Sequence, residues 1–352
     1  MNSKIIGTGS YIPKNVIKNN AFANHFFLDI NGNKIVSENK EIIDKLEAIT
    51  GIKERKYADD NLTSSDIAAE AAKNAINSSS IESETIDYII LAHNIGDVSK
   101  GSIQVDAMPS LASRVKSKLG IKNPNCVAYD ILFGCPGWLE GLIQSNCFIK
   151  SGIAKRCLVI GSETLSRVVD SNDRDGMIFS DGAGAVVTEL NNNGDGILSH
   201  KTVTYANDGE IDFIFYGKSN KIDSDNTKFI KMQGRKVYEF ALNKVPQAMK
   251  LCFDESGYEI DKLKKVFIHQ ANKKMDEAII KRFFKLYDFK APENILPMNI
   301  EEYGNSSTAT IPTLLDLVIN KNYGGHYIEK GDVILFASVG AGMNINAVTY
   351  QL

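Results

Sequence analysis

The chain alternates short apolar strands with amphipathic helices, and the same pattern occurs twice along its length. Residues 86–92 (Ile-Asp-Tyr-Ile-Ile-Leu-Ala) match residues 263–269 (Leu-Lys-Lys-Val-Phe-Ile-His), and the Gly-rich segment 179–185 is similar to 337–342. Alternation of this kind predicts an α/β protein with largely parallel strands. The duplication predicts two similar halves, residues 1–190 and 191–352, that pack face to face with a site at their junction. A chance match of two α/β patterns is the alternative.

Apolar periodicity and helix end signals place the expected elements. We expect strands at 4–7, 88–92, 126–133, 157–160, 183–188, 266–269, 333–337 and 345–350. We expect helices at 65–78, 109–119, 136–151, 234–256, 274–287 and 308–321. A chain of 352 residues that is 43% hydrophobic can bury a large core, as one large domain or two ordinary ones.

Composition narrows the possible classes of function. The net charge of −3 is close to neutral, so we expect neither nucleic acid nor an anionic membrane surface as a partner. No apolar run approaches the ~18 residues of a membrane span, so we expect no membrane insertion. The five cysteines form no CxxC pair and no Cys/His cluster, so no metal site is expected. Their odd number, without a signal peptide, predicts a cytoplasmic protein.

Cys135 lies between an apolar strand and a helix, in Gly134-Cys135-Pro136. Proline suits the first helical position because its missing N–H would be unpaired there in any case. The free N–H groups at a helix start favour thiolate over thiol, so this position suits a nucleophile. The alternative is an inert cysteine that packs as a small hydrophobic residue.

Two polar residues in the second half are candidate partners of Cys135. His269 closes a predicted strand, at an end where α/β proteins bind ligands. Asn305 precedes the predicted helix at 308–321. Each has a structural alternative, as a satisfied core histidine and as a turn or cap residue. The turn at 340–342 (Gly-Ala-Gly) lacks the third glycine of a dinucleotide fingerprint, and its backbone N–H groups are better suited to a thioester carbonyl.

Four motifs follow one another along the chain: Gly-Cys-Pro-Gly at 134–137, His-Gln-Ala-Asn at 269–272, Gly-Asn-Ser-Ser at 304–307 and Gly-Ala-Gly at 340–342. With matching segments at 4–13, 50–55 and 181–185, they resemble the β-ketoacyl-acyl-carrier-protein synthase III family of the thiolase superfamily. The resemblance covers nearly the whole chain. It implies the α/β thiolase fold, two pseudo-repeated βαβαβαββ halves in a five-layered α-β-α-β-α arrangement, and a homodimer.

The resemblance also implies a reaction. Cys135 takes an acyl group from a coenzyme A or acyl-carrier-protein thioester, and a carbanion attacks this acyl-enzyme after a malonyl- or β-ketoacyl-type thioester has lost carbon dioxide. His269, through Nε2–H, and Asn305 stabilise the enolate, while the backbone N–H groups of Cys135 and Ala341 hold the tetrahedral oxyanion. We therefore expect a decarboxylative Claisen condensation in fatty-acid or related lipid biosynthesis, with no metal or redox cofactor.

Further residues gain expected roles from the same resemblance. Substrate contacts are expected at Met108, Phe133, Trp138, Arg174, Gly340 and Gly342, and carrier-protein docking at Lys274. The aromatic and arginine that sandwich adenine in housekeeping members are missing from residues 45–49, which favours a carrier-protein donor.

Two segments, 26–43 and 93–107, are longer than in housekeeping members, which indicates altered substrate choice. With Ala-His-Asn-Ile-Gly-Asp-Val at 92–98 and Phe-Gly-Cys-Pro-Gly-Trp at 133–138, they resemble a specialised branch of the family. That branch includes ketosynthases that join two β-ketoacyl chains toward cyclohexanedione and dialkylresorcinol products. Acyl transfer to a hydroxyl or amine acceptor is a further alternative.

Overall fold

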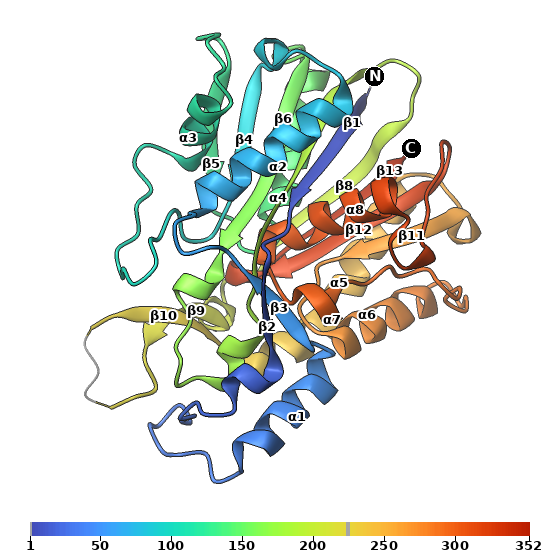
Figure 1. The fold of residues 1–352 in the computed structure, drawn as a ribbon. Helices are drawn as coiled ribbons and strands as arrows, with labels where there is room; N and C mark the ends of the chain where they lie inside the picture. Colours follow the sequence, from blue (N-terminus) through green and yellow to red (C-terminus); the bar gives the residue numbers. More distant parts are fainter. Residues whose placement is uncertain (1, 223–225) are drawn as a thin grey trace.

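Two mixed β-sheets form the framework of the computed structural model, which describes residues 2–222 and 226–352 (Figure 1). The first sheet contains β1 (Asn2–Tyr11), β4 (Tyr88–Ala92), β5 (Val127–Ile131), β6 (Arg156–Thr164) and β7 (Asp181–Asn191), in the order β1-β7-β6-β4-β5. The second contains β8 (Gly196–Thr204), β11 (Leu263–Ile268), β12 (Val333–Gly340) and β13 (Asn344–Gln351), in the order β11-β12-β13-β8.

The two sheets repeat one pattern of strand pairing. In the first, β1 pairs antiparallel with β7, β7 antiparallel with β6, and β6 parallel with β4. In the second, β8, β13, β12 and β11 pair in the same sequence of directions. The internal repeat is therefore confirmed, and β5 extends the first sheet by one parallel strand. The expectation of largely parallel strands is wrong, because the long strands of each half return as antiparallel neighbours.

Helices complete a five-layered arrangement, as the resemblance implied. α2 (Ser64–Ser79) and α3 (Leu111–Lys118) pack on the outer side of the first sheet. α4 (Gly137–Lys150) and α8 (Thr310–Lys321) lie between the sheets, and α5 (Gly234–Glu255) and α6 (Lys273–Lys285) cover the outer face of the second (Figure 1). The central layer is densely apolar, since Trp138 of α4 packs edge-on against Phe336 of β12 with 5.9 Å between ring centroids.

β8 of the second sheet was not expected from the sequence. Several short elements were not expected either: β2 (Asn15–Lys18), β3 (Glu54–Tyr57), β9 (Ile214–Lys218), β10 (Lys228–Met232), α1 (Asn39–Thr50) and α7 (Ile300–Tyr303). These strands pair antiparallel as two separate two-stranded sheets, β2 with β3 and β9 with β10, and carry polar residues that hide their periodicity. α4 begins at Gly137 with Pro136 as its N-cap, one residue later than expected.

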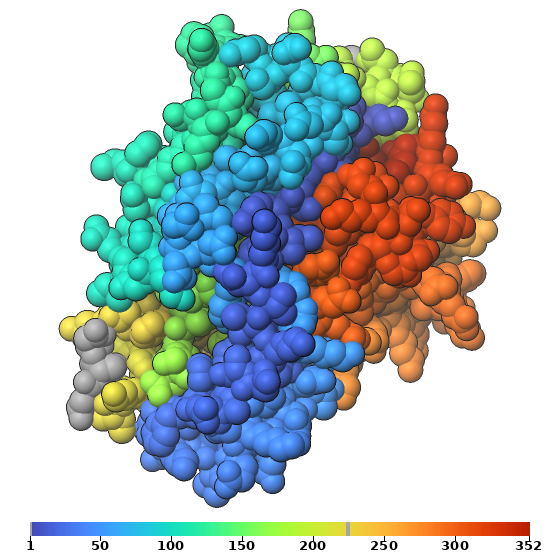
Figure 2. All heavy atoms as spheres, in the orientation of Figure 1, coloured from blue at the N-terminus to red at the C-terminus, as the bar shows by residue number. Residues whose placement is uncertain are grey.

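The two halves of the chain meet along a seam on the face shown in Figure 2. The first half, coloured blue to green, occupies the left and lower part, and the end of the chain, coloured orange to red, occupies the right. Within residues 2–222 and 226–352, no helix combines the length and apolar character needed to cross a membrane.

Candidate active site

Cys135 lies in the tight loop between β5 and α4, pressed against the Gly-Ala-Gly turn of the second half. Gly134 has φ +67°, and a Cβ on it would lie 2.7 Å from Ala341 N. A Cβ on Gly340 would lie 2.4 Å from Cys135 N. Glycine at both positions is what allows these two backbones to approach so closely. The cysteine is thereby held at the junction of the halves.

A mostly apolar cavity of about 240 Å³ opens at Cys135. Its lining comes from both halves, with Leu165, Phe179, Ile230 and Val339 among the apolar residues. The polar groups that reach it are those of Asn94, Cys135, Tyr216, His269, Asn305 and Ser307. The structure therefore brings Cys135, His269 and Asn305 into one cavity, from three separate loops of the sequence.

Asn305 is fixed by both its backbone and its side chain. Its N–H donates to the Ile178 carbonyl at 3.0 Å, and its carbonyl accepts from Ser180 N–H at 2.9 Å. Its side-chain Oδ1 accepts from Ser307 N–H at 2.8 Å. Because the amide oxygen is occupied in this way, the Nδ2 hydrogens are the part of the side chain left for the cavity.

His269 follows β11 and is buried, with its N–H donating to the Ala337 carbonyl at 2.9 Å. Burial lowers the pKa of its imidazole to about 4, so the ring is neutral at physiological pH. The Thr310 hydroxyl lies 2.8 Å from Nδ1 and 2.9 Å from the Ser307 carbonyl, which also accepts from Thr310 N–H. The hydroxyl donates its one proton to the Ser307 carbonyl, and it can donate to Nδ1 only when it turns from that carbonyl, in which case the ring proton resides on Nε2.

The thiol of Cys135 keeps access to the cavity, yet its surroundings are dehydrated. Burial raises the pKa of Cys135 to about 12; a hydrogen bond from Ser307 lowers it, and the negative charge of Glu163 raises it further. The resting group is therefore the neutral thiol. The expected preference for thiolate is wrong for the resting site, because Cys135 precedes the helix N-cap by one residue and loss of hydration outweighs the helix terminus.

A chain of polar residues that we did not predict lies behind Cys135. Asn94 Nδ2 donates to Glu163 Oε1 and, at 2.8 Å, to Ser307 Oγ. Glu163 is fully buried near the end of β6, and Asn94 lies two residues beyond β4. Because β4 and β6 are parallel neighbours, their carboxyl ends meet at one edge of the sheet. Polar residues at the carboxyl ends of two predicted strands were therefore the sequence signal that could have identified Asn94 and Glu163.

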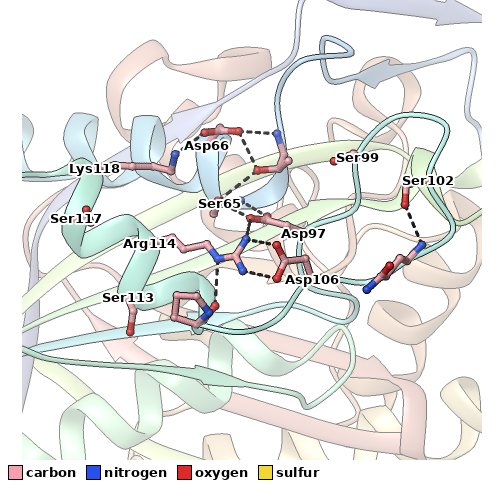
Figure 3. A pocket seen from close by; sticks show the side chains of 13 residues that line it. Ser65, Asp66, Asp97, Ser99, Ser102, Asp106, Ser113, Arg114, Ser117 and Lys118 are labelled. Carbon is pink, nitrogen blue, oxygen red and sulfur yellow. Dashed lines mark hydrogen bonds and ion pairs between the residues drawn. The ribbon is translucent and has the colours of Figure 1, made fainter.

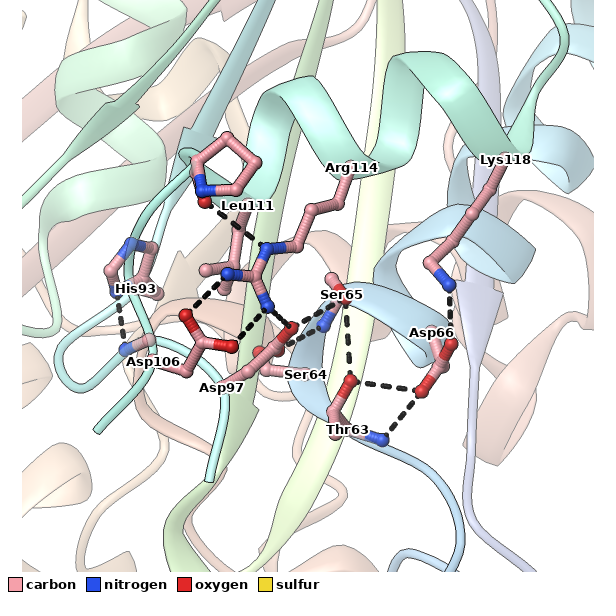
Figure 4. Close-up of polar contacts among 12 residues, drawn as sticks. Thr63, Ser64, Ser65, Asp66, His93, Asp97, Asp106, Leu111, Arg114 and Lys118 are labelled. Atoms are coloured by element: carbon pink, nitrogen blue, oxygen red, sulfur yellow. Dashed lines mark hydrogen bonds and ion pairs between the residues drawn. The ribbon is translucent and has the colours of Figure 1, made fainter. Parts of the chain in front are cut away.

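The long segment 93–107, which carries Asn94, is anchored by two ion pairs, one to the buried Asp97 and one to the exposed Asp106 (Figures 3 and 4). Arg114 of α3 donates to Asp97 at 2.9 Å and to Asp106 at 2.6 Å. Asp97 also accepts from the N–H and the hydroxyl of Ser65, both at 2.7 Å. These charged groups satisfy one another beside a polar cavity of about 610 Å³, on the same segment from which Asn94 bonds to Ser307.

Three of the expected substrate contacts do not line the cavity at Cys135. Trp138 is 1% exposed and lies in the core between the sheets, so the expectation that it contacts substrate is wrong. Phe133 packs beside Ile131, away from the cavity lining. Met108 is 89% exposed on the loop before α3, so within its own chain it does not contact the cavity.

The glycines at 340 and 342 serve the backbone rather than the cavity. Gly340 makes room for Cys135, and Gly342, with φ +74°, lies against the Asn344 side chain. Only Ala341 of this turn lines the cavity. Neither glycine lines the described cavity, and their contact with substrate stays a prediction.

Arg174 lines a second, outer cavity of about 390 Å³. The inner and outer cavities share the walls formed by Met232, Val237, Ala271 and Met275, so the outer one leads toward Cys135. Lys274 lies elsewhere, in an open groove between α1 and α6. Within the ranges that the structure covers, no three or more His, Cys, Asp or Glu side chains gather as a metal site.

Comparisons with known proteins agree with this geometry. Residues 129–206 match the family model of 3-oxoacyl-[acyl-carrier-protein] synthase III, and residues 253–352 match the model of its C-terminal part. The beta-ketoacyl-[acyl-carrier-protein] synthase III of Neisseria meningitidis is 34% identical over 354 residues, which cover 99% of each chain. That of Caldanaerobacter subterraneus is 32% identical over 96% of this chain and 94% of the relative.

Solved structures show the same similarity. The 3-oxoacyl-[acyl-carrier-protein] synthase III of Aquifex aeolicus superimposes with a TM-score of 0.80 at 30% identity, covering 99% of this chain and all of the other. The corresponding synthase of Thermus thermophilus gives 0.81 at 27% identity, with 99% of each chain covered. The chain thus has the thiolase fold and belongs to the β-ketoacyl-[acyl-carrier-protein] synthase III family of acyl-transferring condensing enzymes.

Proposed function

We propose that the protein carries an acyl group on Cys135 and condenses it with a malonyl-type thioester as that thioester loses carbon dioxide. The observation that carries this proposal is the single cavity shared by Cys135, His269 and Asn305. The rest of its lining is largely apolar, which suits a hydrocarbon chain because burial of apolar surface is favourable by about 25 cal/mol per Å².

In the first step, the sulfur of Cys135 attacks the carbonyl carbon of an acyl thioester, and the carrier thiol leaves. The carbonyl oxygen becomes an oxyanion as the tetrahedral intermediate forms. The backbone N–H groups of Cys135 and Ala341, which the glycine contact holds side by side, are the proposed donors to it.

In the second step, loss of carbon dioxide from a malonyl-type thioester leaves an enolate. Asn305 Nδ2–H and His269 Nε2–H are the proposed donors to the enolate oxygen, since their other polar atoms are held by Ser307 and Thr310. A neutral imidazole suits this role because it donates a hydrogen bond without readily protonating the carbanion. The carbanion then attacks the acyl carbonyl, the new carbon–carbon bond forms, and Cys135 leaves.

Cys135→Ala should abolish the covalent acyl adduct, because the alanine has no nucleophile. The measurement is intact-mass spectrometry after incubation with short and medium acyl thioesters. Cys147→Ala is the matched control, since that cysteine is exposed on α4 and should leave the adduct unchanged. A wild-type chain that stays unmodified across all thioesters contradicts the proposal.

Asn305→Ala should slow carbon dioxide release from a malonyl thioester by about a hundred- to a thousandfold, the usual effect of losing one oxyanion donor. Asn305→Asp should be at least as slow, because a carboxylate of the same shape accepts rather than donates. Labelled carbon dioxide release measures both. Release that continues unchanged in a folded Asn305→Ala variant argues against decarboxylation at this site, and acyl transfer without any release favours a simple acyltransferase.

We further propose that Lys274 docks an acidic acyl-carrier protein. Lys53 and Lys273 in the same groove both pair with Glu301, whereas Lys274 is exposed and forms no ion pair among the residues described. Arg174, at the wall of the outer cavity, is proposed to face the phosphate-bearing part of the thioester carrier.

Lys274→Glu should raise KM for an acyl-carrier-protein substrate about fivefold and leave KM for the matching coenzyme A thioester unchanged, because a rim charge acts on encounter with a charged protein. Lys281→Glu, exposed on the same helix, is the control. Equal effects on both donors, or on neither, rule out docking at Lys274.

We propose a homodimer that forms through β5. This strand is the edge of the first sheet, and an exposed edge favours pairing with a second chain. Val127 at the start of β5 is 45% exposed, Leu132 directly after its end is 69% exposed, and Met108 is exposed on the neighbouring loop. Pairing of two copies would cover these residues and direct Met108 of one copy toward the other.

Leu132→Glu should shift the mass in solution from two copies to one, since a charge would be buried in the apolar contact. Light scattering coupled to size exclusion measures this mass. Leu251→Glu, on an exposed position of α5, is the control and should leave the mass unchanged. A wild-type monomer, or a Leu132→Glu variant that remains dimeric, excludes this interface.

A further inference from the structure

Glu163 is a carboxylate whose negative charge acts on Cys135. Its side chain is fully buried, and burying an ionised carboxylate is costly unless it is paired. Among the residues described, no lysine or arginine forms an ion pair with it. Its hydrogen bonds come from Asn94 N–H at 3.3 Å, from Asn94 Nδ2, from the Thr308 hydroxyl at 3.4 Å and from the Ser307 hydroxyl. The carboxylate is therefore held by neutral donors alone.

Ser307 connects this carboxylate to Cys135. The two hydrogens of Asn94 Nδ2 are used by Glu163 and by Ser307 Oγ, the latter at 2.8 Å, so Ser307 Oγ already accepts one hydrogen bond. Ser307 and Cys135 line the same cavity, and the Ser307 hydroxyl forms hydrogen bonds with both Cys135 and Glu163, which lower the pKa of each. One hydroxyl thus lies between the carboxylate and the thiol, with a proton that either can accept.

We propose that Glu163 is a positioning residue that takes up, through the Ser307 hydroxyl, the proton released by Cys135 when its sulfur attacks. This inference rests on the proposed function. The S–H bond of Cys135 breaks as a new O–H bond forms on Ser307. The original Ser307 O–H bond breaks as its proton joins Glu163. The sulfur keeps the electron pair, and the carboxylate becomes a carboxylic acid.

Conservation of charge favours this route over transfer to His269. Before the transfer the buried cluster holds one negative charge, on Glu163, and after it the cluster still holds one, on the sulfur. Transfer to His269 would add an imidazolium and a thiolate beside the existing carboxylate, in surroundings where each buried charge is costly. The pKa values also favour Glu163 over His269 as the proton acceptor, because burial raises the pKa of Glu163 to about 7 and lowers that of His269 to about 4.

The other titratable groups that face Glu163 are His93, Cys135 and Tyr216. His93 Nδ1 accepts from Gly96 N–H at 2.9 Å and Nε2 lies 3.1 Å from Asp130, so both ring nitrogens are engaged away from the relay. Burial and the charge of Glu163 raise the pKa of Tyr216, which therefore remains neutral. Apart from Cys135 itself, Glu163 is the group of this set that a Ser307 hydrogen bond reaches.

The test is the rate of Cys135 alkylation by iodoacetamide between pH 5.5 and 9, which needs no thioester substrate. The carboxylate is the form that accepts a proton, so the wild-type rate should rise as pH increases through about 7. Glu163→Gln and Ser307→Ala should both lose this rise and react about a hundredfold more slowly at pH 8, the usual contribution of one proton acceptor. Thermal unfolding shows that each variant is folded.

Two controls separate the relay from local packing. Thr308→Val removes a hydrogen bond to the same carboxylate but leaves Ser307, and it should keep the rise. His93→Gln should also keep it. The proposal is overturned when the wild type shows no rise near pH 7, when folded Glu163→Gln or Ser307→Ala keeps it, or when His93→Gln alone removes it. A normal alkylation profile in a protein that accepts no acyl group would instead overturn the proposed function.

Discussion

The close contact between the cysteine loop and the Gly-Ala-Gly turn is the constraint on which the rest of the site depends. Gly340 has no Cβ, and one placed there would lie 2.4 Å from Cys135 N. The two sheets are far apart in sequence, but this contact brings the end of the first half's β5 onto the end of β12. The positions of the polar residues that line the cavity, including Asn94 and Asn305, therefore depend on how the two halves meet at this contact.

Burial at the junction then determines the electrostatics. The same dehydration raises the pKa of Cys135 and Glu163 and lowers that of His269, so the cysteine and the histidine are both neutral at physiological pH. The apolar walls of the cavity suit a hydrocarbon chain. Its few polar groups have little water to bind, so they form hydrogen bonds with one another. The resulting chain of hydrogen bonds runs through Ser307, which contacts Asn94 with its side chain and Asn305 with its backbone.

Much of the framework was predictable because it depends on local pattern. β4 ends where the apolar run at 88–92 ends, and α2 and α5 begin and end within one residue of the expected bounds. The two small two-stranded sheets and α1 were not predictable, since their residues are polar or irregular and pack only in context. Cys135, His269 and Asn305 were candidates from their motifs, whereas Asn94 and Glu163 resembled ordinary residues of strand ends. Trp138 was expected to contact substrate because it is close to Cys135 in the sequence, but its side chain packs in the core between the sheets.

The sequence by itself determined the family, the duplicated α/β pattern and the three polar residues that gather at the cavity, because each depends on residue type and order. Only the tertiary structure decided that the strands are mixed, that the resting cysteine is a thiol and that Glu163 lies behind it. The reason is physical. Strand direction, dehydration and contact between side chains depend on what lies across the molecule, and residues 163 and 307, which are 144 positions apart, meet only when the two sheets are packed.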